Sequence, residues 1–278
     1  KKAKRLRVTK LVEHVSYSSV KKFVPSWGGC PYYFKLAWVD KIRLSEPNIF
    51  TEFGKAVHDT LEAAVLGKIE QSDNILTKHF EQSFDTLMKE VTLDESRFPE
   101  KEVNKFYDQG RKLVVAAIPA LKEYFGEFEV VSAEEQLFQE FREYTKNDYI
   151  FKGFIDLVLK TPDGKYHIID WKTTSWGWKA QKKGSPETTY QLTFYKKFFA
   201  EKHGIDPDLI ETHFGLLKRT AKTNAVEIFR VTSGPRKTSS ALKLLTDCVY
   251  NIDHGRFIKN RMACERCEYN RTEYCSGA

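Results

Sequence analysis

The chain has 278 residues, of which 41% are hydrophobic and 30% are charged, and its formal net charge at pH 7 is +7. This length can bury a full hydrophobic core, so we expect one domain over residues 1–278, and the positive charge favours a polyanionic partner such as nucleic acid. The longest apolar run, 113–121, is too short to span a bilayer and contains Pro119, which excludes a membrane-spanning segment there.

The amino-terminal part of the chain, 1–126, is expected to be mainly helical. Its basic start is not followed by the apolar segment of a signal peptide, so we expect a cytoplasmic protein, or one in the host cytoplasm if it is viral. A short helix is capped by Ser18 or Ser19, and Pro31 starts the next, over 32–40. Thr51 opens a stronger helix, and further helices are expected over 74–89 and 101–125. The helix after Thr51 has apolar residues at helical spacing: Phe53, Val57, Leu61 and Ala64.

Strands dominate the next part of the chain, 127–173. A helix then begins at Thr188 or Thr189 and runs to about Glu201, and two strands follow over 211–218 and 225–231. The last segment, 233–278, contains a helix with one apolar face and a cysteine-bearing tail. This order predicts one α/β core, 127–232, with helices around it.

A hairpin is predicted around Pro162-Asp163-Gly164, because two β-rich runs flank this turn sequence. A three-residue loop pairs Thr161 with Lys165. Counting back along both strands then places Asp156 opposite Asp170, with Cβ atoms roughly 4.5–5.5 Å apart. Lys172 lies two residues beyond Asp170 and points to the same side of the sheet.

Two facing carboxylates repel each other unless a cation lies between them, and Mg²⁺ and Mn²⁺ prefer such oxygen ligands. Asp156 and Asp170 are therefore candidate metal ligands, and Lys172 is a candidate to stabilise negative charge on a phosphate or to orient water. The alternative is a surface hairpin with a weak, exposed ion pair. The apolar residues flanking both aspartates favour the first interpretation, because lone buried carboxylates are costly.

Several short motifs follow one another in the chain. They are Gly54-x-x-x-His58, Gly153-x-x-Asp156, Asp170-x-Lys172 and Gln191-x-x-x-Tyr195.

This series resembles the PD-(D/E)xK nucleases of the RecB type, whose fold is a restriction-endonuclease-like central mixed sheet flanked by helices. The resemblance implies that Asp156 and Asp170 bind a divalent metal, with His58 as a further ligand. It also implies that Lys172 assists phosphodiester hydrolysis and that Gln191 and Tyr195 line the site. An additional acid is expected on the strand before the hairpin, either Glu135 or Glu134.

Four cysteines lie at the two ends of the chain: Cys30, Cys264, Cys267 and Cys275. Clustered cysteines in a cytosolic chain more often bind metal than form disulfides, and thiolates favour an iron–sulfur cluster or zinc. The layout resembles the iron–sulfur nucleases of the AddB and CRISPR-adaptation type. That resemblance implies a [4Fe–4S] cluster joining the two ends, although the gap from Cys267 to Cys275 is longer than usual and zinc stays open.

The other cysteine and the other histidines are expected to be structural. Cys248 lies on the apolar face of the last helix. The remaining histidines show no paired metal spacing: His14, His79, His167, His203, His213 and His254.

A candidate substrate surface follows Lys172. It combines aromatic and cationic residues, which suits the stacking of bases and the contacts to phosphates of a single strand. An equally good interpretation is a solvated loop whose tryptophans fold back onto the core. The residues are Trp176, Trp178, Lys179, Lys182 and Lys183.

Together these features predict a Mg²⁺- or Mn²⁺-dependent DNA exonuclease that acts on single strands or free ends, with protein partners in a repair, replication or CRISPR-adaptation complex. One alternative is a nucleic-acid-binding recombination or assembly protein with little or partner-gated nuclease activity. Another is an RNA-processing nuclease, which would share every motif above.

Overall fold

The computed structural model describes residues 11–141 and 149–277. The basic segment 1–7 lies outside the described residues. The chain divides into two compact units, a larger one of residues 46–136 and 154–233 and a smaller one of residues 1–45, 137–153 and 234–278. No helix in the described part of the chain is both long and apolar enough to cross a membrane.

Four helices of the larger unit begin close to the predicted positions, with one informative difference, and the short helix Ala180–Gly184 was not predicted. The side chain of Asn48 accepts the backbone N–H groups of Phe50 and Thr51, so the helix starts two residues before Thr51. Thr51 closes the capping box instead, because its hydroxyl accepts the backbone N–H of Asn48. The helices are α3 (Ile49–Val65), α4 (Asp73–Met88), α5 (Glu100–Phe125), α6 (Ala180–Gly184) and α7 (Pro186–His203).

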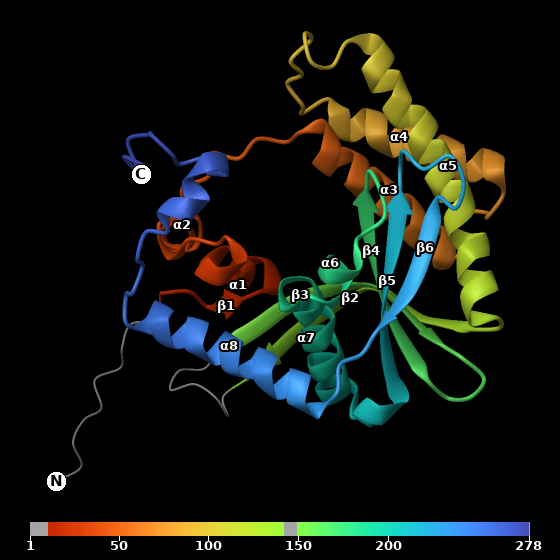
Figure 1. The fold of residues 1–278 in the computed structure, drawn as a ribbon. Helices are drawn as coiled ribbons and strands as arrows, with labels where there is room; N and C mark the ends of the chain where they lie inside the picture. Colours follow the sequence, from red (N-terminus) through yellow and green to blue (C-terminus); the bar gives the residue numbers. More distant parts are fainter. Residues whose placement is uncertain (1–10, 142–148, 278) are drawn as a thin grey trace. The chain divides into compact units, whose positions relative to one another are not determined.

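The strands form one mixed sheet in the order β1-β3-β4-β5-β6, with β2 paired to β3 (Figure 1). The β3–β4 and β5–β6 pairs are antiparallel, whereas β4 and β5 are parallel and α6 and α7 lie in the connection between them. This confirms the predicted α/β architecture. The strands are β1 (His14–Val15), β2 (Glu129–Glu140), β3 (Ile150–Lys160), β4 (Tyr166–Thr174), β5 (Ile210–Lys218) and β6 (Val226–Val231).

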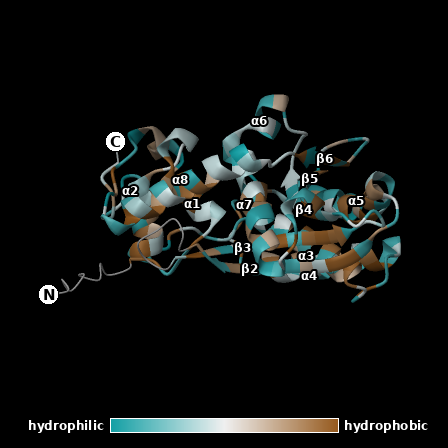
Figure 2. Ribbon diagram, turned by 90° about the horizontal axis from the view of Figure 1, so that it is seen from below, coloured by the Kyte–Doolittle hydropathy of each residue, from teal (hydrophilic) through white to brown (hydrophobic). Residues whose placement is uncertain are grey.

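Apolar side chains of α3, α4 and α5 pack together and against strand residues such as Leu157, Ile169 and Trp171. Figure 2 shows hydrophobic residues on these strands and along α3 and α5. Because neighbouring strand residues point to opposite faces, Asp170 and Lys172 face away from this core. They face α7, which packs on β4 and β5.

The smaller unit contains β1, which pairs in parallel with Ile150 and Phe151, several short helices and the long helix Pro235–Asp253. The first helix is capped by Ser16, not by Ser18 or Ser19, because the Ser16 hydroxyl accepts the backbone N–H of Ser19. Pro31 is the first residue of the next helix, as predicted. The helices are α1 (Tyr17–Phe23), a 3-10 helix (Pro25–Trp27), α2 (Pro31–Phe34), a π-helix (Lys35–Val39), α8 (Pro235–Asp253) and a second 3-10 helix (Arg261–Arg266).

Candidate active site

The β3–β4 hairpin has the predicted register. The Thr161 N–H donates to the Lys165 carbonyl at 3.0 Å, and Gly164 adopts the left-handed conformation with φ 83°. The paired residues end at Leu157 and Ile169, and one step further Asp156 stands opposite Asp170. At this point the backbone N–H of Trp171 donates to the Asp156 carboxylate at 2.6 Å, where a β3–β4 ladder hydrogen bond would otherwise follow. The two aspartates therefore meet where the two strands stop pairing.

Asp170 is the most buried carboxylate of the site, with 1% of its surface exposed. Lys172 Nζ lies 2.6 Å from Asp170 Oδ2. On the other side, Gln191 Nε2 donates to Asp170 Oδ1 at 2.8 Å, and it also lies 2.9 Å from the Tyr195 hydroxyl. The Gln191-x-x-x-Tyr195 pair thus sits on one face of α7 and fixes the orientation of Asp170.

His58 and a glutamate complete the cluster. Ligand atoms of His58, Glu134 and Asp156 all lie within 4.8 Å of one another, and His58 Nδ1 is 3.6 Å from Asp156 Oδ2. Gly54, one turn before His58, brings α3 close to β4, since a Cβ there would lie 3.1 Å from the Thr173 hydroxyl. The Gly54-x-x-x-His58 spacing therefore allows the close approach and supplies the imidazole.

Glu134, not Glu135, is the acid that joins the site. Its backbone has φ 48°, which is uncommon for a residue with a side chain and interrupts the alternation of β2. Glu135 instead receives hydrogen bonds from Lys202 at 2.5 Å and His203 at 2.9 Å. Burial raises the pKa of Glu135, but these two hydrogen bonds outweigh burial and lower it overall.

The pKa values of the carboxyl groups in the cluster are raised, so these groups are harder to ionise than ordinary carboxyl groups. Burial raises the pKa of Asp156 and that of Asp170 to about 6 each. Glu134 is an exposed residue, but partial burial of its carboxyl group and the neighbouring Asp156 raise its pKa to about 7. Burial lowers the pKa of Lys172, but Asp170 and Asp156 outweigh it and raise this pKa overall. These raised carboxyl pKa values indicate that an additional positive charge at the site would stabilise the ionised carboxylates.

This donor set fits a divalent metal ion. Burial and the Lys172 charge lower the pKa of His58 to about 4, so its imidazole is neutral and offers a lone pair. The carboxylates supply the oxygen ligands that Mg²⁺ and Mn²⁺ prefer, and Mn²⁺ also accepts imidazole nitrogen.

Some residues of the predicted substrate surface are exposed, as a surface that stacks bases requires, whereas others fold back onto the core. Trp178 folds back onto the strands, with its ring 5.2 Å from that of Phe214, and Lys182 Nζ lies 4.3 Å above it. Lys183 forms an ion pair with Glu227. Trp176, by contrast, is 72% exposed, and Lys179 is exposed at the start of α6. Trp176 is the aromatic residue of this loop that is open to a base.

The four predicted cluster cysteines lie together in the smaller unit, where Cys30, Cys264, Cys267 and Cys275 line one small pocket. The backbone N–H of Asn260 donates to the Cys30 sulfur at 3.3 Å. Cys248 is buried in α8, and burial raises the pKa of its thiol to about 12.

A mixed sheet flanked by helices, with two acids and a lysine on one hairpin, is the arrangement of a class of nucleases. The model of the PD-(D/E)XK nuclease superfamily matches residues 14–272, and the chain belongs to this superfamily. No curated protein matches the chain.

Comparison with solved structures gives matches at low sequence identity, and the first of them shares the fold. One, from Eubacterium rectale and provisionally described as an exonuclease, is 15% identical with a TM-score of 0.59, covering 98% of this chain and 93% of that chain. Another, called SSO0001, is 14% identical with a TM-score of 0.35 and covers 80% of this chain and 94% of that chain.

Proposed function

We propose that this nuclease is a metal-dependent DNA exonuclease acting on single strands or free ends, hydrolysing one phosphodiester bond at a time. The observation that carries the proposal is the convergence of three carboxylates, a neutral imidazole and one ammonium group around Asp156 and Asp170. The exposed Trp176, four residues after Lys172 in the chain, supports a single-stranded substrate, because a base can stack on it. The exonuclease description of a protein with the same fold is consistent with action at ends.

In this proposal His58, Glu134, Asp156 and Asp170 would hold Mg²⁺ or Mn²⁺. When bound, such an ion neutralises phosphate charge and lowers the pKa of water. Lys172 would place its ammonium group against the phosphate and stabilise the charge that develops there. Gln191 keeps Asp170 in place through its 2.8 Å hydrogen bond, and the Tyr195 hydroxyl in turn positions Gln191.

The proposal is tested by incubating the purified protein with end-labelled DNA and matched RNA, single-stranded and duplex, in Mn²⁺, Mg²⁺ or EDTA. We expect DNA to be shortened from an open end, and cleavage to stop when both ends are blocked or EDTA is added. Faster cleavage of RNA would favour an RNA-processing nuclease. Binding of DNA without turnover in any divalent metal would favour the recombination or assembly role.

We also propose that the four clustered cysteines bind a [4Fe–4S] cluster. Cys30, Cys264, Cys267 and Cys275 line one small pocket, which brings together the four thiols that such a cluster needs. The N–H donors to Cys30 and Cys267 suit cluster sulfurs, which are tuned by such hydrogen bonds.

An anaerobic preparation is therefore expected to be brown, with absorbance at about 400 nm from thiolate-ligated iron. Cys275→Ser should lose this absorbance, whereas Cys248→Ala should keep it, because Cys248 is buried in α8, away from the pocket. A colourless protein with one zinc ion per chain would rule out the cluster.

We further propose that the protein acts in the cytoplasm, with partners in a repair, replication or CRISPR-adaptation complex.

A further inference from the structure

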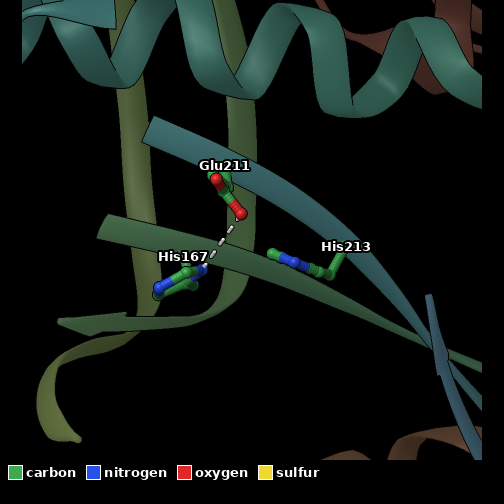
Figure 3. Close-up of side chains that lie close together, drawn as sticks. All are labelled: His167, Glu211 and His213. Atoms are coloured by element: carbon green, nitrogen blue, oxygen red, sulfur yellow. Dashed lines mark ion pairs between the residues drawn. The ribbon is translucent and has the colours of Figure 1, made fainter. Parts of the chain in front are cut away.

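A second group of metal-ligating side chains lies on the sheet of the larger unit, away from the candidate active site. It consists of His167 on β4 and Glu211 and His213 on β5, whose ligand atoms all lie within 4.8 Å of one another (Figure 3). His167 pairs with Glu211 in the parallel β4–β5 register, and His213 is two residues further along the same face. Asp170 is three residues from His167 and therefore points to the opposite face.

The two imidazole rings are buried, and in each ring one nitrogen lacks a hydrogen-bond partner among the described residues. His167 is 6% exposed and His213 is 1% exposed. Among the residues that the structure describes, neither Nδ1 atom has a hydrogen-bond partner. A buried polar atom without a partner costs free energy, and here two such atoms occur side by side, with ring centroids 5.3 Å apart.

The hydrogen bonds around His167 fix which nitrogen carries the proton. The Thr161 hydroxyl lies 2.9 Å from His167 Nε2 and is also hydrogen-bonded to the Asp163 carboxylate. Since an ionised carboxylate only accepts hydrogen bonds, the Thr161 hydroxyl donates to Asp163 and must accept the Nε2–H of His167. His167 Nδ1 therefore presents a lone pair, which lies 4.0 Å from Glu211 Oε2.

Glu211 has one oxygen engaged and one facing the imidazoles. Lys165 Nζ and Arg230 contact its Oε1 at 3.3 and 3.2 Å, whereas Oε2 faces His167. Burial lowers the pKa of His167, and burial together with His167 lowers the pKa of His213 to about 3, so both rings are neutral. The lone pair of His167, the neutral imidazole of His213 and a carboxylate oxygen of Glu211 thus converge.

We propose that His167, Glu211 and His213 bind a transition-metal ion of the zinc class, at a site separate from the active site. Two imidazoles and a carboxylate are a donor set typical of Zn²⁺, and the Thr161 hydroxyl orients one ligand as an outer-shell partner. The Glu211 side chain is 14% exposed and Lys165 is 42% exposed, which gives the ion a path to an otherwise buried site. The ion would clamp β4 to β5, three residues before Asp170.

The test is Zn²⁺ titration of the metal-stripped full chain, followed by calorimetry and thermal unfolding, for the wild type and Glu211→Gln. The Glu211 side chain is partly exposed at the edge of this group of residues, so glutamine preserves the packing. We expect the wild type to bind one more equivalent of Zn²⁺ than the variant, or to bind it at least about 10-fold more tightly, and to gain thermal stability from it. Both proteins contain the same cysteines and the same active site, so their difference reports this site alone.

Co²⁺ provides a second measurement that does not depend on stability. The wild-type minus Glu211→Gln difference spectrum should show visible bands of nitrogen- and oxygen-ligated cobalt without a thiolate charge-transfer band. His167→Gln should remove the same bands. Equal Zn²⁺ stoichiometry and affinity in the wild type and Glu211→Gln, with a flat difference spectrum, would overturn the proposal.

Discussion

Lys172→Met is expected to lower the rate of DNA cleavage by about 10²–10³-fold while the protein stays folded, which is the effect of removing one preorganised group that stabilises transition-state charge. Methionine keeps the length and apolar stem of lysine but removes the ammonium group, which lies 2.6 Å from Asp170. Asp170 retains its hydrogen bond from Gln191, so its position should change little. The loss should appear in single-turnover cleavage, with DNA affinity largely retained.

Lys160→Met is the matched control, because Lys160 belongs to the same hairpin but lies over the ring of Tyr166, remote from the carboxylates. This variant should cleave at close to the wild-type rate. If Lys172→Met cleaved as fast as Lys160→Met, Lys172 would have no part in the reaction.

Gly215→Ala is expected to destabilise the larger unit by about 2 kcal/mol, within the roughly 1–3 kcal/mol that overpacking a rigid core costs. Gly215 pairs with Trp171 across the parallel β4–β5 ladder, and a Cβ at Gly215 would overlap the Trp171 ring. Trp171 is 3% exposed and cannot move into solvent. The midpoint of thermal unfolding should therefore fall by roughly 4–8 °C. Activity should fall as well, because Trp171 lies between Asp170 and Lys172 in the chain.

Gly184→Ala provides the control for this substitution. A Cβ at Gly184 meets no atom within 4 Å, and the position ends α6. Its unfolding midpoint should match that of the wild type. Equal midpoints for Gly215→Ala and the wild type would show that Trp171 does not pack on Gly215 as described.

The part of the site that was predictable from sequence depends on local chemistry. Pro162-Asp163-Gly164 specifies a three-residue turn, and a fixed turn sets the register of every residue behind it. The register then follows by counting, so Asp156 and Asp170 could be placed opposite each other without any tertiary information. The spacing of Gln191 and Tyr195 likewise puts both on one face of a helix.

Other parts depend on backbone detail or on distant pairing, and no local signal reveals them. Glu134 and Glu135 are adjacent glutamates, and the left-handed conformation at position 134 decides which of them joins the site. His167 and His213 were expected to be structural, since 46 residues separate them in the sequence, and the β4–β5 register brings them together. Trp176 and Trp178 are two residues apart, yet the first is exposed and the second is packed on Phe214.

Asp170→Asn shows whether the acids at the end of the β3–β4 pairing form a metal-dependent nuclease site. Asparagine preserves the shape of this buried side chain but removes its charge. We expect Asp170→Asn to lose cleavage of end-labelled single-stranded DNA in Mn²⁺, whereas Asp163→Asn, in the exposed turn of the same hairpin, should cleave normally. Cleavage by Asp170→Asn at the wild-type rate would mean that these acids are not the nuclease site.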